Sequence, residues 1–316
     1  MNAPETRAIP RWVALGRRAV RVLPRGRYPL MSWLCRRPGR PFVSPLDVTR
    51  RRLSFVCDLG DAIAREACFM GHYEPQETVV VRSLLGAGGC FVDVGANWGY
   101  FTLLAADLVG PAGRVVALEP HPSLFAALEE NVGRNRLTRV TPLRVAAADR
   151  DGEMNLAGFG RGVENSGVSR LTDEPDPSTP NFNVPTRLLE TVLDEHGVGP
   201  VDLLKMDIEG GEGLVLPTLA GGLSSGRYRR ILLELHPAAL ARRGQSAAGL
   251  VEMLLGYGYR GWRIDHSRAA FRRAAYRLPP SPESFLLPLD PAALTADWPH
   301  VLFCAPGVAA PPGGEA

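Results

Sequence analysis

Short apolar runs alternate along most of the chain with longer segments in which apolar residues recur every three or four positions. Runs of the first kind predict buried strands, and segments of the second kind predict helices. The predicted strands are 52–59, 63–69, 90–94, 114–120, 140–148, 201–207, 229–237, 259–265 and 300–306. The predicted helices are 11–23, 74–86, a segment after the glycine turn that stops at Gly110, and then 123–135, 187–197 and 247–258. This alternation is typical of an α/β fold whose mostly parallel sheet has helices on both faces.

Polar composition marks the segments outside this pattern. Residues 157–183 are rich in Gly, Ser, Pro and Asn and predict a long loop. Residues 1–52 contain 13 Arg and only two acids, hence a net charge of +11, whereas the remaining 23 basic and 31 acidic residues give −8. We therefore expect a basic N-terminal arm over 1–52, a domain over 53–306 and a flexible tail over 307–316.

The arm allows two interpretations. Its segment 11–23 can form a short amphipathic helix that packs on the domain surface. Alternatively, the basic helix provides peripheral contact with an anionic membrane or an acidic partner.

The cysteines and the hydropathy of the chain indicate its compartment. The five cysteines show neither a C-x-x-C pair nor a zinc-binding spacing, which favours isolated reduced thiols. No apolar run approaches the roughly 20 residues that a membrane span needs, and arginines interrupt any secretory signal. The expected location is the cytoplasm.

The turn after the strand 90–94 indicates a nucleotide cofactor. In "VDVGANWG" the residues Ala96, Asn97 and Trp98 separate Gly95 from Gly99, so the middle glycine of a dinucleotide-binding G-x-G-x-x-G is missing. This absence disfavours a nicotinamide oxidoreductase. Asp93 precedes the first glycine and can face a positively charged amino-acid end, as in S-adenosylmethionine.

Further cofactor contacts are expected where the next two strands end. Glu119, which precedes Pro120, can accept hydrogen bonds from both ribose hydroxyls. Asp149, which follows Ala148, can meet the adenine amino group. The predicted cofactor-binding residues are Asp93, Gly95, Ala96, Asn97, Gly99, Glu119, Pro120, Ala148 and Asp149.

These motifs resemble those of FkbM-type methyltransferases. The similar segments are "YEPQETVVVRSLLGAGGCFVDVGANWGYFT", "VVALEPHPSLFAALEENV", "VAAADRDG" and "VDLLKMDIEGGE" with the following "LLELHP", in family order over about residues 72–237. The resemblance implies the class I, Rossmann-like methyltransferase fold with a seven-stranded sheet and S-adenosylmethionine as donor. It also implies O-methylation of a hydroxyl on a sugar, glycan or natural product. It does not identify the acceptor, whose selection we expect from the termini and from residues 157–183.

Lys205 is the only lysine in a chain with 35 arginines. Side chains alternate along a strand, so Leu203, Lys205 and Asp207 share one face, and Asp207 reaches the carboxyl end where ligands bind. A buried ammonium needs partners, and the candidates are Asp207, Glu234 and Asp93. The expected position is a narrow slot that suits the compact ammonium better than a planar guanidinium.

Methyl transfer to a hydroxyl also needs a base. His236 ends the fifth parallel strand and titrates near neutral pH, while Asp207 and Glu209 are alternatives. The predicted catalytic residues are Lys205, Asp207, Glu209 and His236; His72, His121 and His300 have weaker positional arguments. Asp207 with Glu234 or His236 could also hold magnesium, but no metal is assigned.

Two other functions compete with a small-molecule O-methyltransferase. A nucleic-acid methyltransferase would fit the basic arm, but "DIEG" stands where amino-methylating enzymes usually carry Asn/Asp-Pro-Pro-aromatic, and the acidic body repels phosphates. A non-catalytic cofactor-binding domain would lack an acceptor pocket, whereas this chain has polar residues at the strand ends. We therefore expect a small-molecule or glycan acceptor and no nucleic acid.

Overall fold

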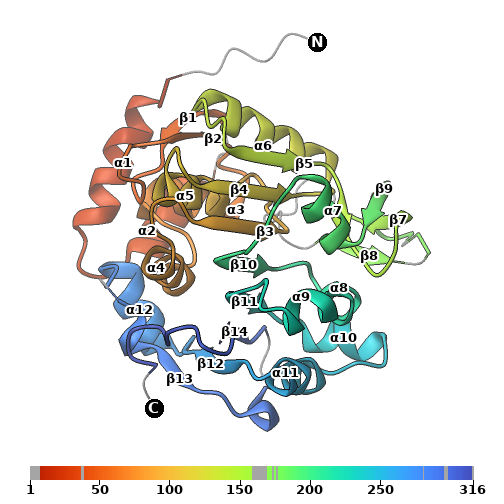
Figure 1. The fold of residues 1–316 in the computed structure, drawn as a ribbon. Helices are drawn as coiled ribbons and strands as arrows, with labels where there is room; N and C mark the ends of the chain where they lie inside the picture. Colours follow the sequence, from red (N-terminus) through yellow and green to blue (C-terminus); the bar gives the residue numbers. More distant parts are fainter. Residues whose placement is uncertain are drawn as a thin grey trace.

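The protein is built around one large sheet, whose strands lie one below another from β5 to β13 in Figure 1. The computed structural model describes residues 8–36, 39–158, 169–172, 174–175, 177–279, 281–294 and 298–314. The sheet has eight strands in the order β13-β12-β14-β11-β10-β3-β4-β5. Their bounds are β3 Cys90–Val94, β4 Arg114–Leu118, β5 Val140–Leu143, β10 Leu203–Met206, β11 Arg230–Glu234, β12 Arg260–Ile264, β13 Leu286–Pro288 and β14 His300–Cys304.

The strand directions confirm the predicted fold class. β5, β4, β3, β10 and β11 pair in parallel, and β14 lies antiparallel between β11 and β12. These seven strands form the mostly parallel sheet that the sequence predicts. The short β13 adds an eighth strand at the edge, which the apolar pattern did not reveal.

Helices cover both faces of the sheet because its strands are apolar on both sides. One face packs against α4 (Pro75–Leu84), α5 (Tyr100–Val109) and α6 (Pro122–Arg134). The other face packs against α7 (Leu189–Glu195), α9 (Ala220–Ser224) and α11 (Ala247–Gly256). Three further helices follow later in the chain, α8 Glu212–Val215, α10 Pro237–Arg242 and α12 Arg268–Tyr276, with 3-10 turns at Leu216–Leu219, Pro282–Ser284 and Pro291–Ala293.

A second, four-stranded sheet takes up part of the predicted loop and the residues on both sides of it. It joins β6 (Ala146–Ala147), β7 (Gly152–Ala157), β8 (Arg170–Thr172) and β9 (Asn181–Arg187) in the order β6-β9-β7-β8. The strand predicted over 140–148 is therefore wrong as one element, because β5 and β6 belong to different sheets. The loop predicted over 157–183 was also partly wrong, although residues 159–168, 173 and 176 lie outside the described chain. Antiparallel strands with one solvated face tolerate this polar composition.

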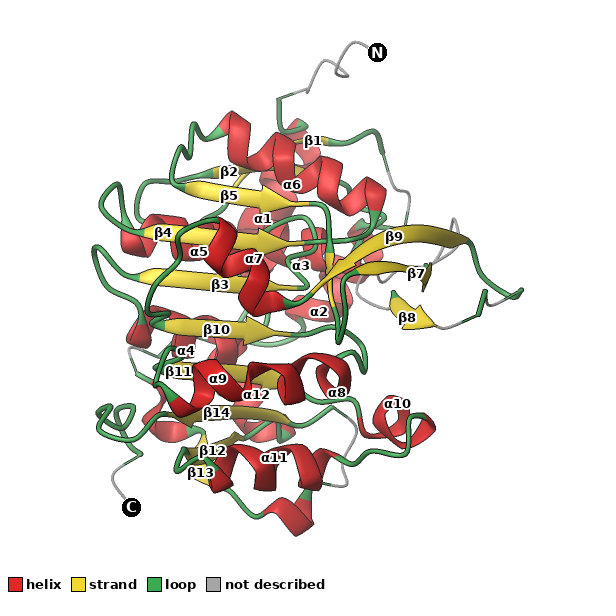
Figure 2. Ribbon diagram, turned by 45° about the vertical axis from the view of Figure 1, so that its right-hand side comes forward, coloured by secondary structure: helices red, strands yellow, loops and turns green. Residues whose placement is uncertain are grey.

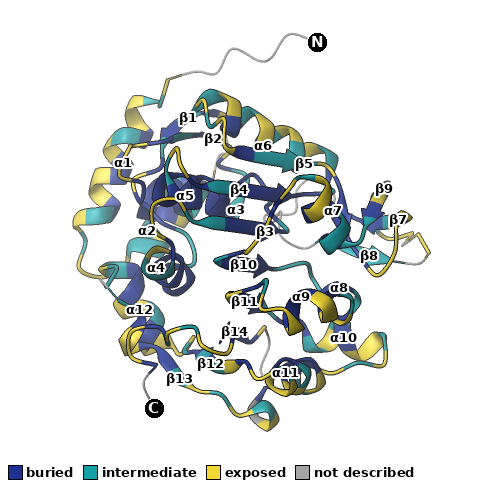
Figure 3. Ribbon diagram, in the orientation of Figure 1, coloured by how far each residue is buried: buried dark blue, intermediate teal, exposed yellow. Residues whose placement is uncertain are grey.

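The N-terminal region folds onto the domain. It contains α1 (Arg11–Val22), α2 (Arg27–Leu34) and β1 (Phe42–Pro45), which pairs with β2 (Ser54–Cys57). The boundary expected at residue 52 thus falls inside a two-stranded sheet. Figure 3 shows the buried inner and exposed outer sides of α1.

The strand predicted over 63–69 is wrong, because these residues form α3 (Ala62–Met70). Asp61 Oδ1 accepts a hydrogen bond from Ala64 N at 2.7 Å and caps the helix start. Gly71, at φ +91°, ends the helix in the left-handed conformation. These caps were visible in the sequence, but a short apolar run does not separate helix from strand.

The tail beyond residue 306 packs on the domain as far as it is described. Arg260 donates to Val308 O at 2.9 Å, and Pro311 is buried. All five cysteines are free thiols, as predicted. Within the described residues, no helix has the length and apolar character needed to cross a membrane.

Candidate active site

The cavity at the carboxyl edge of the sheet contains most of the predicted site residues. Its volume is about 320 Å³. It lies where the chain order reverses, since β4 and β5 follow β3 on one side and β10 and β11 lie on the other. Figure 2 shows the arrowheads of these strands ending along this edge. Ligands of open α/β sheets bind at such a reversal.

The glycine turn after β3 lies directly against the end of β10. Gly95 has φ +87°, and a Cβ there would lie 1.9 Å from Asp207 O. Gly99, at φ +97°, would bring a Cβ within 2.7 Å of Leu128. Only glycine allows the turn to approach β10 this closely.

Glu119 holds the same turn from β4. Its two carboxylate oxygens accept hydrogen bonds from Asn97 N and His121 N, both at 2.8 Å. Burial raises the pKa of Glu119 to about 7. Each oxygen keeps a further lone pair, and Glu119 and Pro120 line the cavity, so the pair of ribose hydroxyls can bind there.

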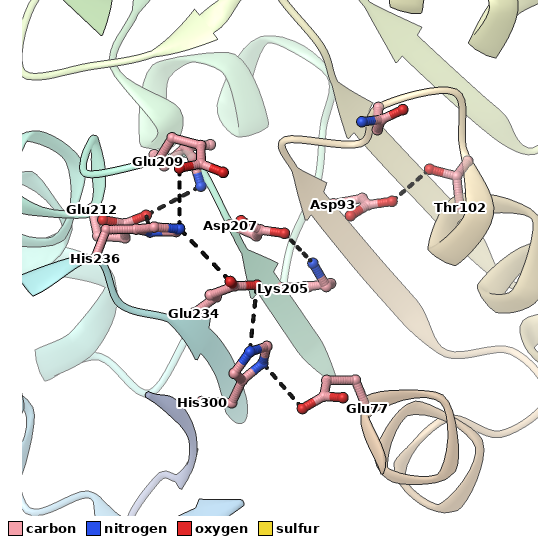
Figure 4. Close-up of polar contacts among 12 residues, drawn as sticks. Glu77, Asp93, Thr102, Lys205, Asp207, Glu209, Glu212, Glu234, His236 and His300 are labelled. Carbon is pink, nitrogen blue, oxygen red and sulfur yellow. Dashed lines mark hydrogen bonds and ion pairs between the residues drawn. The ribbon is translucent and has the colours of Figure 1, made fainter. Parts of the chain in front are cut away.

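Lys205 is buried at the sheet centre, as predicted. Its Nζ lies 3.2 Å from Asp207 Oδ2 (Figure 4). It also lies 4.7 Å from the centre of the Phe101 ring. Burial disfavours the ammonium, but four carboxylates outweigh it and raise the pKa of Lys205 above its ordinary value. These belong to Asp207, Glu74, Asp93 and Glu234. The direct partner is therefore Asp207, one of the three carboxylates predicted as candidates.

Asp93 lies beside Lys205 on β3. Its Oδ2 accepts a hydrogen bond from Thr102 Oγ1 at 2.6 Å. Burial raises the pKa of Asp93, which Lys205 and Thr102 partly oppose. Asp93 lines the cavity next to the glycine turn.

His236 lies behind the cavity wall and not on it. Its Nδ1 is 3.1 Å from Glu212 Oε1, and its Nε2 is 3.4 Å from Glu209 Oε2. Burial lowers the pKa of His236, but the Glu212 hydrogen bond and the Glu212, Glu209 and Asp207 charges raise it to about 9. The imidazole is therefore charged at neutral pH, which disfavours the predicted role as base.

Glu209 does line the cavity, beside Asp207. It has φ +54°, an unusual backbone conformation for a residue other than glycine. Burial raises the pKa of Glu209 to about 7, although His236 opposes this. The carboxylate thus titrates near neutral pH, in the range that suits a general base.

A second carboxylate–imidazole group extends from the cavity. His300 places Nδ1 3.0 Å from Glu77 Oε1 and Nε2 3.6 Å from Glu234 Oε2. His266 Nε2 is 2.7 Å from the same Glu77 oxygen, and its ring stacks on His300 with centroids 4.2 Å apart. The lone pair of an imidazole nitrogen lies in the plane of its ring. Because the His266 and His300 rings are stacked and nearly parallel, one metal ion cannot lie in both ring planes.

Two other groups of side chains could hold a metal. Asp207, Glu209 and His236 form one, and Glu74, Asp207 and Glu234 form the other, each with ligand atoms within 4.8 Å. In the first group His236 is hydrogen-bonded to Glu212, so a metal ion would have to displace its proton and change this contact. In the other group, Lys205 already pairs with Asp207. The residues therefore fit a lysine-centred site better than a magnesium site.

Three predicted cofactor residues do not line the cavity, namely Gly99, Ala148 and Asp149. Asp149 is exposed and pairs with Arg150 at 3.2 Å, and Ala148 is buried in the protein. Val145, Ala146 and Ala147 line the cavity in their place. The adenine contact of Asp149 gains no support from this geometry.

Sequence reasoning gave no role to several lining residues, among them Glu66, Tyr73, Glu74 and His266. Glu74 belongs to the Tyr-Glu-Pro motif, where Pro75 begins α4 and Glu74 has φ +40°. This motif could have identified Glu74 as a site residue from the sequence. Glu66 on α3 and His266 after β12 belong to no such motif, so the sequence did not mark them as site residues.

Residues 93–260 match the family model described as "Methyltransferase FkbM domain". The chain is 28% identical over 200 residues to the 31-O-demethyl-FK506 methyltransferase FkbM of Streptomyces tacrolimicus, covering 55% of this chain and 74% of that protein. It is 27% identical over 199 residues to the AMB antimetabolite synthetase AmbE of Pseudomonas aeruginosa, covering 53% of this chain but only 9% of that protein. Among solved structures, methyltransferase FkbM from Methylobacillus flagellatus aligns with a TM-score of 0.42 and 16% identity, covering 77% of this chain and 55% of that one.

Proposed function

Because the chain belongs to the FkbM methyltransferase family and is an S-adenosylmethionine-dependent enzyme, we propose that it methylates a hydroxyl of a sugar, glycan or natural-product acceptor. The relative from Streptomyces tacrolimicus is named for an O-methylation of a natural product, which supports this choice. The observation that carries the proposal is the position of Glu209 beside Asp207 on the cavity wall.

The charges of the cavity favour an acceptor without phosphate. Among the described residues that line it, no arginine occurs, although the chain has 35. Lys205 is the permanent cation there, and Asp207 pairs with it. The acidic side chains on the wall are Glu66, Glu74, Asp93, Glu119, Asp207, Glu209 and Glu234. A neutral or amine-bearing acceptor fits this wall, and a nucleic acid does not.

Different residues have different roles in the proposed methyl transfer. S-adenosylmethionine supplies a methyl group that the sulfonium already activates. The turn from Asp93 to Gly99 and the Glu119 carboxylate position the donor on the β3 and β4 side. Glu209 accepts the hydroxyl proton, and Asp207, with its pKa lowered, accepts a hydrogen bond that orients the hydroxyl. Burial raises the Asp207 pKa, but Lys205 outweighs it.

His236 acts on Glu209 in this scheme. Its imidazolium, 3.4 Å away, favours the ionised form of Glu209 and fixes its direction. Glu212 is fully buried and also accepts hydrogen bonds from Ile208 N and Gly210 N, so the His236 ring is held in place. His236 is thus a positioning residue for the base.

The test combines calorimetry with a transfer assay. S-adenosylhomocysteine should bind, and methyl transfer should be found on hydroxyls of a macrolide, a neutral glycan or an amino sugar. Glu209→Gln should lower turnover with little change in S-adenosylhomocysteine affinity. Transfer to nucleic acid, or to the nitrogen of the amino sugar, would contradict the proposal.

A further inference from the structure

The outer sides of α1 and α2 expose large apolar side chains to solvent. Six such side chains are exposed in the described chain, and four lie on these helices. They are Trp12 at 43%, Leu15 at 65%, Val22 at 77% and Trp33 at 60%. A patch of this kind on a protein surface usually marks an interaction site.

Arginines surround these apolar side chains. Arg11, Arg18, Arg25 and Arg36 are exposed, and within the described residues none of their side chains is recorded in a hydrogen bond or ion pair. No acidic residue occurs between residues 8 and 46. These four arginines and the four apolar side chains together form what we call the α1–α2 face, whose positive charge is not neutralised locally.

The α1–α2 face cannot turn inward, because the opposite side of α1 is fixed in the core. Val13 and Val20 are fully buried, and Arg17 and Arg21 bind Asp47. A Cβ on Gly16 would lie 3.0 Å from Leu34, so α1 packs closely against the end of α2. The start of α1, with Trp12, and the end of α2, with Trp33, therefore lie at the same end of the helix pair.

We propose that the α1–α2 face docks on the surface of an anionic lipid bilayer. Tryptophan and aliphatic side chains bury at the boundary between headgroups and acyl chains, while arginines contact lipid phosphates. The combination of aromatic, aliphatic and arginine side chains without an acid fits this partner. An acidic protein would require complementary apolar pockets, and it becomes an outcome of the test.

The docking surface lies one helix away from the cavity. Tyr28 on α2 donates to Glu66 Oε1 at 2.9 Å, and its ring centre lies 5.6 Å from that of Phe271. Glu66 and Phe271 both line the cavity. The α1–α2 face and the cavity are therefore connected through direct side-chain contacts.

Vesicle co-sedimentation of the full chain tests the docking without any acceptor. We expect binding to vesicles of equal parts phosphatidylcholine and phosphatidylglycerol, and little binding to phosphatidylcholine alone. Arg11→Gln with Arg18→Gln should weaken binding by about tenfold or more at low salt. Trp12→Ser with Trp33→Ser should weaken binding as well. Brominated acyl chains should quench tryptophan fluorescence in the wild type, and this quenching should be lost in the double variant.

Leu255→Ser is the matched control, since Leu255 on α11 is a 37% exposed apolar side chain outside both the α1–α2 face and the cavity wall. It should bind vesicles like the wild type. Equal recovery with neutral and anionic vesicles would overturn the docking, and so would wild-type binding by the tryptophan double variant. Binding of S-adenosylhomocysteine, measured in parallel, tests the proposed function separately, so failure of one does not imply failure of the other.

Discussion

Lys205 and Asp207 form a buried ion pair at the centre of the sheet, with Nζ and Oδ2 3.2 Å apart. The lysine side chain is 6% exposed and the aspartate side chain is 25% exposed, so the pair lies at the floor of the cavity. Phe101 closes the slot on the other side of the ammonium. The first prediction follows from this closed geometry.

Lys205→Met should destabilise the protein by about 3 kcal/mol, because it leaves a carboxylate unpaired beneath the cavity. Lys205→Arg should recover only part of this loss, since a planar guanidinium does not fit the slot against Phe101. Chemical denaturation of the three proteins measures the differences. An arginine variant as stable as the wild type would mean that the slot does not select for lysine.

Lys205→Ala should create affinity for a divalent cation. Without the ammonium, Glu74, Asp207 and Glu234 offer oxygen atoms within 4.8 Å of one another and no cation between them. Calorimetric titration with Mg²⁺ or Ca²⁺ should show binding by the variant and none by the wild type. Strong binding by the wild type at this position would instead support a metal enzyme.

Glu119→Ala should weaken S-adenosylhomocysteine binding by about 10- to 100-fold, because hydrogen bonds to a carboxylate are worth about 1.5–3 kcal/mol. Asp149→Ala is the control, since Asp149 is exposed outside the cavity wall and should have no effect. Isothermal calorimetry at about pH 8 keeps Glu119 ionised, given its pKa of about 7. A larger loss for Asp149→Ala would restore the predicted adenine contact.

Gly95→Ala should destabilise the protein by at least about 3 kcal/mol, because strain at φ +87° adds to a clash with Asp207 O. Gly133→Ala, within α6, is the matched substitution. A Cβ there meets nothing within 4 Å, so the variant should gain about 0.5–1 kcal/mol from helix propensity. Thermal melting distinguishes the two, and equal melting temperatures would contradict the close approach.

His236 should make stability depend on pH in the alkaline range. Its folded pKa of about 9 lies above the ordinary 6.5, so its contribution is complete below about pH 6.5 and is lost as the pH rises through 9. The shift corresponds to about 3 kcal/mol. The difference in unfolding free energy between the wild type and His236→Gln should therefore shrink by about this amount between about pH 6 and pH 9.5. A constant difference would show that the histidine is neutral.

The features predictable from the sequence were those that follow from local backbone geometry. The two-residue repeat of a strand placed Lys205 and Asp207 on one face, and the structure pairs them. The spacing of Gly95 and Gly99 predicted the turn, because both need a left-handed backbone. These inferences needed no knowledge of what packs against the strand.

The features that were missed depend on distant segments. Segment 63–69 was predicted as a strand because five small or apolar residues around Arg65 and Glu66 are compatible with either element, and this error hid Glu66 from the site. The charge of His236 depends on Glu212 and Glu209, which both lie close to its ring. Glu212 is the first residue of α8, and Glu209 has a left-handed backbone conformation. A sequence shows that such groups exist, but their mutual distances set the pKa.

Phe55 of β2 stacks on Trp98, which lies in the glycine turn after β3, with ring centroids 4.7 Å apart. Asn131 joins the same two segments, since its side chain accepts from Val56 N and donates to Trp98 O. The family match begins only at residue 93, yet the turn at its start rests on residues well upstream. If the turn binds the methyl donor as proposed, a chain shortened to the matched region should bind S-adenosylhomocysteine more weakly, because it loses this support. The unit recognised by sequence comparison is therefore smaller than the unit that folds, and exchange of the N-terminal region between relatives would alter cofactor binding.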